Sequence, residues 1–286
     1  MTALRRALFA ALTAATLLAV AVTATACGTN PGKSQNDIIE DIKARNYICV
    51  SVKINVPNFS VLTNPSVPVY EGFEIDLAYI IAADIFSITP EEAKLRRAAR
   101  FVNLDESRRE VSLENGNVDM IISSYTINDD RKRRMLFSQP YYTDVLGILT
   151  DADGDIKSFA DLDQKKVGVL KDSTSEENTK LYINENGRIE RIEFVEFAQE
   201  SISEWFTDND SFLNKNVDAF ISDKCILKGL KNNNPAVTVL PDEFGTESFG
   251  VAFKMSHEVL KKRIDALLDT MKEDGSLQAL KDKWKI

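Results

Sequence analysis

The amino-acid sequence predicts an α/β protein made of two lobes. Short apolar runs, typical of buried strands, alternate with segments in which apolar residues recur at helical spacing. This alternation begins near residue 37, and a second run of the same pattern begins after Tyr142. Because strands that alternate with helices usually form a mostly parallel sheet, each run predicts one α/β lobe. A ligand site is expected where the strand ends converge.

The first run opens with a helix. Asn36 can cap it, and Ile38, Ile39 and Ile42 share one face up to its end near Arg45. The further elements expected in this run are a strand at 48–53, a loop rich in Pro and Asn at 55–70, a helix at 73–87, a short strand at 101–102, a helix at 107–115 and a strand at 118–122.

The second run contains most of the predicted strands. They are expected at 145–149, 166–170, 192–197, 219–221, 237–240 and 248–253. Helices are expected at 175–183 and 202–213 and from near Cys225. The tail is helical as well, because Leu260, Ile264 and Leu268 lie on one helical face, and a last helix is expected at 277–284.

Length and charge exclude one class of partner. At 286 residues with 44% hydrophobic content, the chain has room for more than one core. Its formal charge of -9 argues against nucleic acid, because a phosphate backbone requires a basic surface.

The N-terminus predicts export. Two arginines precede an apolar, alanine-rich stretch at 7–26, and small residues lead directly to Cys27. This arrangement predicts a signal peptide at 1–26 and resembles a bacterial lipobox, in which Cys27 becomes the lipidated first residue. A polar tether is then expected at 27–36. The alternative is a plain transmembrane anchor, and with either arrangement the rest of the chain lies outside the cytoplasm.

Two further cysteines, Cys49 and Cys225, lie in an expected strand and near an expected helix start. An exported protein could pair them, but each also fits a small buried apolar position. We expect free thiols.

The residue inventory argues against catalysis. The only histidine, His257, lies at an expected helix start and is interpreted as a surface residue. The sequence contains no HExxH, CxxC, P-loop or GxSxG pattern, so we expect no enzyme, no metal and no cofactor. The acidic segment 151–155 lacks the spacing of a calcium loop and is expected to be a surface turn.

The segment 124–131 indicates a receptor for a small carboxylate. Hydroxyl residues follow the strand expected at 118–122, and a helix start that carries Arg131 comes next. Hydroxyls, exposed backbone N–H groups and a guanidinium together bind carboxylates well. However, Arg131 also opens a basic run at 131–134, and such runs are usually solvated helix faces. Spacing alone favours that second interpretation.

Several segments together resemble a known family. They are 70–78 (YEGFEIDLA), 115–120 (NGNVDM), 124–131 (SYTINDDR), 137–142 (FSQPYY), 167–169 (VGV) leading to 172–174 (DST), 217–223 (VDAFISD) and 274–275 (DG) before Trp284. In this order they resemble the extracytoplasmic amino-acid-binding proteins of ABC-type importers, solute-binding protein family 3, and specifically the glutamate-binding group. The resemblance covers nearly all of the mature chain.

The resemblance implies a type II periplasmic-binding-protein-like fold, in which two α/β lobes joined by two hinge strands close on the ligand. Residues 37–145 and 246–286 would form lobe 1, and residues 146–245 would form lobe 2.

The resemblance also implies the roles of five residues. Arg131 would clamp the ligand α-carboxylate, and Thr126 would assist through its hydroxyl. Ser124 would offer its backbone carbonyl to the amino group, or its own hydroxyl. Thr174 would donate its backbone N–H to the same carboxylate. Asp223 would receive the α-ammonium, and a helix N-cap is its alternative or additional role.

The side-chain pocket would be basic. Arg109 matches the position at which binders of acidic amino acids carry an arginine, and Lys53 matches a second basic position. Arg109 taken singly could equally be a solvated helix residue, and its neighbour Arg108 blurs the assignment. Two departures concern lobe 2: Asp172 stands where many relatives have Gly, and Leu170 where some have Lys.

The function implied is that of a monomeric lipoprotein on the outside of the cell membrane. It would capture glutamate or aspartate and deliver it to ABC permease subunits, with no nucleic-acid partner and no reaction catalysed. The alternatives are a sensory module that signals to a membrane partner, a binder of glutamine or asparagine, and an exported dehydratase.

Overall fold

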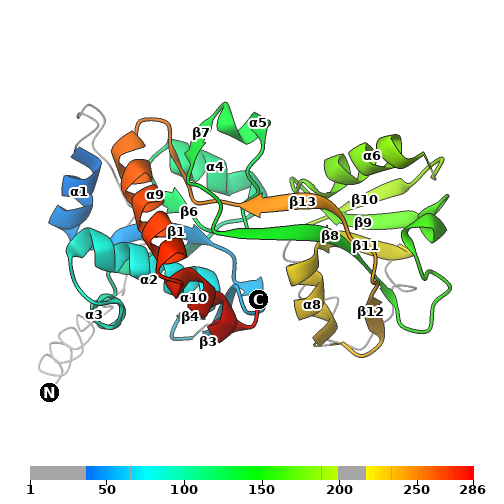
Figure 1. Ribbon diagram of the computed structural model, residues 1–286, viewed down its shortest axis with the longest axis horizontal. Coiled ribbons are helices and arrows are strands. Elements are labelled where there is room, and N and C mark those ends of the chain that lie inside the picture. Colours follow the sequence, from blue (N-terminus) through cyan, green and yellow to red (C-terminus); the bar gives the residue numbers. More distant parts are fainter. Residues whose placement is uncertain (1–36, 65, 188, 199–216, 233) are drawn as a thin grey trace, which may run out of the picture.

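The computed structural model describes residues 37–64, 66–187, 189–198, 217–232 and 234–286. Two α/β lobes lie next to one another along the longest axis, and β8 (Tyr142–Asp151) and β13 (Phe244–Phe249) run between them (Figure 1). The signal peptide, Cys27 and the tether predicted at 1–36 lie outside the described residues, as does the helix predicted at 202–213.

Lobe 1 is built on a five-stranded sheet with the order β5-β1-β6-β14-β7. These strands are β5 (Ala99–Asn103), β1 (Ile48–Val52), β6 (Met120–Ile121), β14 (Ala252–Lys254) and β7 (Met135–Phe137). β1 is parallel to both of its neighbours, whereas β14 is antiparallel to β6 and to β7. The parallel arrangement that the sequence predicts therefore holds for three of the strands.

The helices of lobe 1 surround this sheet. They are α1 (Asp37–Arg45), α2 (Phe73–Phe86), α3 (Pro90–Leu95), α4 (Glu106–Glu114), α5 (Asp129–Lys132), α9 (Glu258–Glu273) and α10 (Ser276–Trp284). α2 is buried on most sides because apolar and small residues occur around its whole circumference. The C-terminal helices α9 and α10 pack against it, so the end of the chain completes the lobe that the beginning starts.

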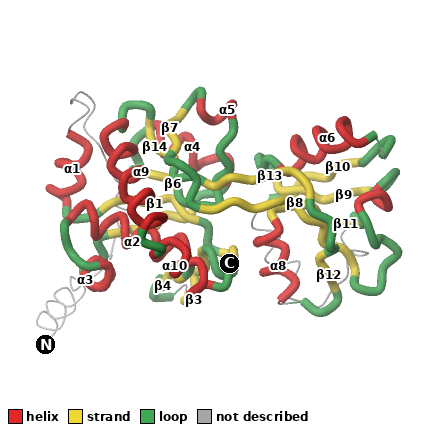
Figure 2. The backbone as a smooth tube through the Cα atoms, in the orientation of Figure 1, coloured by secondary structure: helices red, strands yellow, loops and turns green. Residues whose placement is uncertain are grey.

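Lobe 2 is built on a sheet with the order β10-β9-β11-β8-β12, and β13 also pairs with β8. Its own strands are β10 (Glu193–Phe197), β9 (Lys166–Leu170), β11 (Ala219–Asp223) and β12 (Val237–Val239). β10, β9 and β11 are parallel, and β8 is antiparallel to β11. The helices α6 (Ser175–Asn186) and α8 (Lys224–Asn232) lie on opposite sides of this sheet (Figure 2).

Side chains of β11 point alternately to the two faces of the lobe 2 sheet, and this explains why a helix packs on each face. Ala219 and Ile221 belong to the core cluster that contacts α6, whereas Phe220 belongs to the cluster that contains residues of α8. Successive side chains of a strand point to opposite faces, so one short apolar strand supports a helix on each side.

The two lobes are also in apolar contact. The Phe59 ring of lobe 1 lies 5.0 Å from the ring of Tyr142 on β8 and 6.3 Å from the ring of Phe249 on β13. On α8, a Cβ atom added to Gly229 would come within 2.6 Å of Pro57 Cγ. Pro57 therefore brings lobe 1 against a helix of lobe 2, and Phe59 packs on β8 and β13, the two hinge strands, at their lobe 1 ends.

Two predictions of secondary structure were wrong. The loop expected at 55–70 contains a three-stranded antiparallel sheet of β2 (Asn55–Val56), β3 (Ser60–Asn64) and β4 (Val69–Glu71). The single strand expected at 248–253 is divided into β13 and β14. The division occurs because β13 pairs with β8, whereas β14 enters the sheet of lobe 1. The lobe boundaries predicted at 145/146 and 245/246 fall inside β8 and β13 and stay a prediction.

Other elements agree with the sequence analysis. The strand at 166–170 is observed as predicted, and the helices that contain 37–45, 73–86 and 175–183 are present. Residues 152–155 form the expected turn after β8. Among the helices of the described ranges, none combines the length and apolar character needed to cross a bilayer.

The cysteines do not behave alike. Cys225 is a free thiol, as expected, whereas Cys49 is disulfide-bonded, so the expectation of a free thiol was wrong for Cys49. Since Cys225 is free, these two cysteines do not pair with each other.

The interpretation of His257 as a surface residue was also wrong. The imidazole is 8% exposed at the start of α9 and lies beside the backbone of Asp119. Burial, together with the nearby charges of Lys254 and Arg45, lowers the pKa of His257 from 6.5 to about 4. The structure therefore holds this histidine in its neutral form.

This burial predicts acid sensitivity. The unfolded chain takes up the His257 proton near pH 6.5 and the folded chain only near pH 4, so stability is lost as the pH falls through this window. A shift of this size corresponds to at most about 3 kcal/mol. We expect His257→Gln to lack this loss. The free energies of unfolding of the variant and the wild type, measured in urea, should therefore converge or cross as the pH falls from 7 to 4. Parallel pH profiles for the two proteins would contradict the prediction.

Candidate functional site

Polar side chains gather where the two lobes meet the hinge strands. The residues that the sequence predicts for the site in lobe 1 are all buried, namely Lys53, Arg109, Ser124, Thr126 and Arg131. In lobe 2, Thr174 is buried at the start of α6, and Asp223 is half-buried at the end of β11.

Arg131 is not a solvated helix residue, unlike the three basic residues that follow it. Its side chain is 7% exposed, and its Nη1 donates a hydrogen bond to the backbone oxygen of Thr126 at 2.8 Å. Its Cζ lies 4.1 Å from the centre of the Tyr125 ring. Asn128 caps α5 by accepting the backbone N–H of Arg131 at 2.9 Å. The guanidinium is thus held in one orientation, as a carboxylate clamp requires.

The Tyr125 ring also supports Arg109. The Cζ of Arg109 lies 4.2 Å from the ring centre, and its Nη1 lies 3.4 Å from the Ser123 hydroxyl. The neighbouring Arg108 is exposed and bonds to Asp105 instead. Of the two arginines, Arg109 is the buried one, and its contact with the ligand stays a prediction.

Two guanidinium groups close to one ring repel each other. Burial, and then the charge of Arg109, lowers the pKa of Arg131. The negative charge of Glu110 offsets part of this repulsion, because its carboxylate lies 3.9 Å from Arg131 Nε. The same carboxylate accepts a hydrogen bond from the Tyr125 hydroxyl. Neither Tyr125 nor Glu110 was expected as a site residue from the sequence, since neither carries a periodicity or spacing signal.

Ser124 has a left-handed backbone conformation, with φ of 49°. Its N–H donates to Glu74 Oε1 at 2.5 Å, and its hydroxyl lies 3.3 Å from the same oxygen. The Tyr141 hydroxyl donates to that oxygen at 2.6 Å. Such conformations are uncommon outside glycine and persist where surrounding contacts enforce them. Glu74 provides these contacts and positions the segment that leads to Thr126 and Arg131.

Glu74 is itself fully buried on α2, and burial raises the pKa of its carboxyl. The sequence carried one signal for it, because a charged residue within the apolar segment 73–82 requires a buried partner.

Thr126 is fixed by the hinge. It forms an isolated antiparallel bridge with Phe249 of β13, and the N–H of Ile127 donates to the backbone oxygen of Ser248 at 2.8 Å. Any movement of β13 relative to lobe 1 therefore acts directly on this segment.

In lobe 2, the Thr174 hydroxyl is engaged by the protein. It lies 3.0 and 3.1 Å from the two carboxylate oxygens of Glu247, a fully buried residue of β13. The backbone N–H of Thr174 is the group for which a ligand contact was predicted. Asp172, which departs from the glycine of many relatives, adopts a φ of 57°, a conformation that Asp tolerates better than most residues.

Asp223 faces charges from both lobes. Burial and the negative charge of Glu247 raise the pKa of Asp223 well above its usual range, while Lys53 and Arg131 oppose this rise. The predicted α-ammonium acceptor is thus close to two predicted cations of lobe 1. In the first turn of α8, the N–H of Cys225 donates to Asp144 at 2.8 Å, and the N-cap role of Asp223 stays a prediction.

The site is suited to hold a small zwitterion. A carboxylate would find the cations of lobe 1, and an ammonium group would find Asp223 of lobe 2. Within the described ranges, no group of three or more His, Cys, Asp and Glu residues is arranged to hold a metal ion.

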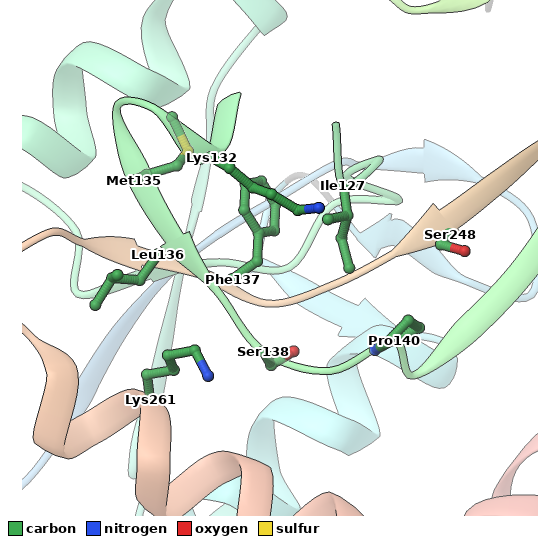
Figure 3. Close-up of a pocket in the computed structure, with 9 residues that line it drawn as sticks. All are labelled: Ile127, Lys132, Met135, Leu136, Phe137, Ser138, Pro140, Ser248 and Lys261. Carbon is green, nitrogen blue, oxygen red and sulfur yellow. The ribbon is translucent and has the colours of Figure 1, made fainter. Parts of the chain in front are cut away.

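A separate cavity of about 580 Å³ opens beside β7 (Figure 3). Its wall is partly apolar, with Ile127 and Phe137, and the amino groups of Lys132 and Lys261 point toward it. None of the predicted site residues lines this cavity.

The family model described as bacterial extracellular solute-binding proteins, family 3, matches residues 48–285. The chain belongs to this family. The glutamine-binding ABC transporter protein GlnH of Bacillus subtilis (strain 168) is 32% identical over 253 residues, covering 88% of this chain and 86% of that protein. The glutamine-binding protein of Geobacillus stearothermophilus is 31% identical and covers 80% of this chain and 78% of its own length.

Solved structures of family 3 proteins have the same fold. An ancestral arginine-binding protein bound to arginine has a TM-score of 0.68 at 28% identity, covering 84% of this chain and 98% of that one. The ancestral amino-acid-binding protein AncCDT-1, a precursor of cyclohexadienyl dehydratase, has a TM-score of 0.68 at 27% identity, covering 86% and 98%. The prediction of a two-lobe, type II periplasmic-binding-protein fold is confirmed.

Removing the Glu74 carboxylate should destabilise the protein. Glu74→Ala leaves the Ser124 N–H and the Tyr141 hydroxyl as buried donors without an acceptor, each at a cost of about 1–3 kcal/mol. We expect urea unfolding to show a loss of about 2–4 kcal/mol. Tyr141→Phe removes only one donor and should lose about 1 kcal/mol. A Glu74→Ala protein as stable as Tyr141→Phe would contradict this account.

Proposed function

We propose that this protein captures an amino acid between its two lobes and delivers it to an ABC-type importer. The observation that carries the proposal is the burial of Arg131 and Lys53 in lobe 1, where their charges act on Asp223 of lobe 2. An α-amino acid presents a carboxylate and an ammonium group on one carbon, which matches opposite charges placed close together. Similar proteins of the family bind glutamine and arginine, according to their names.

The roles proposed for the remaining residues follow from this placement. Arg131 binds the ligand α-carboxylate, with the Thr126 hydroxyl and the Thr174 N–H beside it. Asp223 receives the ammonium, and Ser124 contributes its carbonyl or hydroxyl. The protein supplies both counter-charges, so the ligand can be buried in its charged form.

We propose an acidic side chain for the ligand. Lobe 1 buries three cationic residues, Lys53, Arg109 and Arg131. Arg109 lies against the same Tyr125 ring as Arg131, so a second carboxylate on a ligand bound at Arg131 would lie near another guanidinium, and hydrogen bonds between charged groups are stronger than neutral ones. This argument supports glutamate or aspartate.

Glutamine is the second candidate. Two relatives at 31% and 32% identity are named glutamine-binding proteins. In addition, the buried carboxylates of Glu74, Asp144 and Glu247 already offset part of the positive charge near the site. An amide would add no further charge.

We propose that the protein binds its ligand without catalysing a reaction, although a structural relative is described as a precursor of a dehydratase. A dehydratase requires a general acid and a general base close to the ligand. The only histidine of the chain, His257, contacts the Asp119 backbone and is absent from the contacts of the site. Delivery to a permease rather than signalling to a sensor, and a monomeric state, are part of the same proposal.

A panel of amino acids tests the ligand class. A ligand at about 100 times its Kd stabilises the folded protein by about 2.7 kcal/mol, which raises Tm measurably. We expect glutamate or aspartate to give the largest shift among glutamate, aspartate, glutamine, asparagine, arginine and histidine. A larger shift with glutamine would select the second candidate. No shift with any of them would overturn the proposed function, and turnover of a prephenate-type substrate would overturn binding without chemistry.

Replacing the clamp should abolish tight binding. Arg131→Ala leaves the ligand carboxylate without its main partner, and we expect a loss of about 3 kcal/mol or more in calorimetry, a factor of over one hundred in Kd. Arg133→Ala is the matched control, because Arg133 is exposed two residues later and pairs with Asp130. Near-normal affinity of Arg131→Ala would contradict the assignment, and so would equal losses in both variants.

A further inference from the structure

Two carboxylates lie directly opposite each other on the hinge strands. In the antiparallel pairing of β8 and β13, Asp144 is the register partner of Glu247. Asp144 is 8% exposed and Glu247 is fully buried. Like charges at directly opposite positions of an antiparallel pair are destabilising, and burial increases this cost. An arrangement of this kind requires compensating contacts.

Glu247 finds its contacts on the first turn of α6. One of its oxygens accepts the Asn178 side-chain amide at 2.6 Å, and both oxygens lie within 3.1 Å of the Thr174 hydroxyl. Thr174 is the N-cap residue of α6, and Asn178 lies one turn further on. The carboxylate thus joins the hinge strand to the beginning of this helix.

Asp144 finds its contacts on the first turn of α8. It accepts the backbone N–H of Cys225 at 2.8 Å, and the Cys225 thiol is a further hydrogen-bond partner. A negative charge at a helix N-terminus is favoured by the unpaired N–H groups and by the helix dipole. Asp144 therefore joins a hinge strand to the first turn of α8, as Glu247 joins the other hinge strand to the first turn of α6.

Each of the two helices directly follows a proposed ligand contact. Thr174 immediately precedes α6, and Asp223 immediately precedes α8. These are the two contacts that lobe 2 contributes under the proposed function. The two facing carboxylates of the hinge therefore hold the two places at which lobe 2 meets the ligand.

We propose that Asp144 and Glu247 are positioning residues of the ligand site, each fixing one ligand contact of lobe 2 to the hinge strands. The inference rests on the proposed function. Glu247 sets the position of the Thr174 N–H that receives the ligand carboxylate, and Asp144 sets the position of the Asp223 carboxylate that receives the ammonium. Small displacements of such contacts reduce affinity strongly.

Truncation and conservative substitution distinguish positioning from direct contact with the ligand. Glu247→Ala and Asp144→Ala remove the acceptors, and we expect calorimetry to show affinity for the best amino acid of the panel weakened tenfold or more. Glu247→Gln and Asp144→Asn keep an acceptor oxygen without the charge, and we expect affinity within about threefold of wild type. If the amide variants lose as much as the alanine variants, the charges act on the ligand directly, and the positioning role is overturned.

Thr174 provides a second route if an alanine variant fails to fold. Thr174→Val keeps the backbone N–H and removes only the hydroxyl that Glu247 accepts, so affinity should fall at least fivefold, whereas Thr174→Ser should be close to wild type. Combining Thr174→Val with Glu247→Ala should add little further loss, because both break one contact. Full additivity of the two losses, or an unaffected Thr174→Val, overturns the inference.

Asp161→Ala is the matched control. Asp161 also holds a first helical turn in lobe 2, by accepting the N–H and hydroxyl of Ser158, but no proposed ligand contact adjoins that turn. We expect it to lower Tm and leave affinity unchanged, and an equal loss of affinity overturns the positioning role. Wild-type protein that binds no amino acid overturns the proposed function and this inference with it. Wild-type binding with unchanged affinity in Glu247→Ala overturns the inference alone.

Discussion

Charges buried between the two lobes require partners, and this requirement accounts for most of the polar contacts around the junction. Arg131 and Lys53 lie on one side, and Asp223 and Glu247 act on them from lobe 2 and the hinge. Because a buried charge without a partner is costly, the positions of these side chains depend on one another across the lobes. The geometry of the site is therefore a property of both lobes together and of neither lobe alone.

The hinge strands not only connect the two lobes but also carry residues that contact both of them. β13 bridges to Thr126 of lobe 1 and carries Glu247 toward α6, while β8 carries Asp144 toward α8. Phe59 packs against both strands from lobe 1. A change in the angle between the lobes must alter these contacts at the same time. This coupling is the physical basis on which a ligand between the lobes can favour one arrangement of the protein over another.

The residues of the candidate site could be named from the sequence through the order of the family motifs, whereas local spacing alone favoured a solvated helix face for Arg131. Arg131 follows a strand and a helix cap, and Asp223 ends a short apolar strand. The choice between Arg108 and Arg109 was not accessible in this way, since both occupy one helix and differ only in what packs beside them. Glu247 carried no local signal at all, because its partners Thr174 and Asn178 are about seventy residues away.

By itself, the sequence determined the two α/β runs, most of their helices and strands, and the order of motifs that relates the chain to solute-binding proteins of family 3. These features follow from periodicity and turn chemistry, which act over a few residues. Only the tertiary structure decided that 55–70 forms a small sheet, that His257 is buried and that Asp144 faces Glu247. Each of these features depends on contacts between segments that are far apart in the chain, and local sequence patterns carry no information about such contacts.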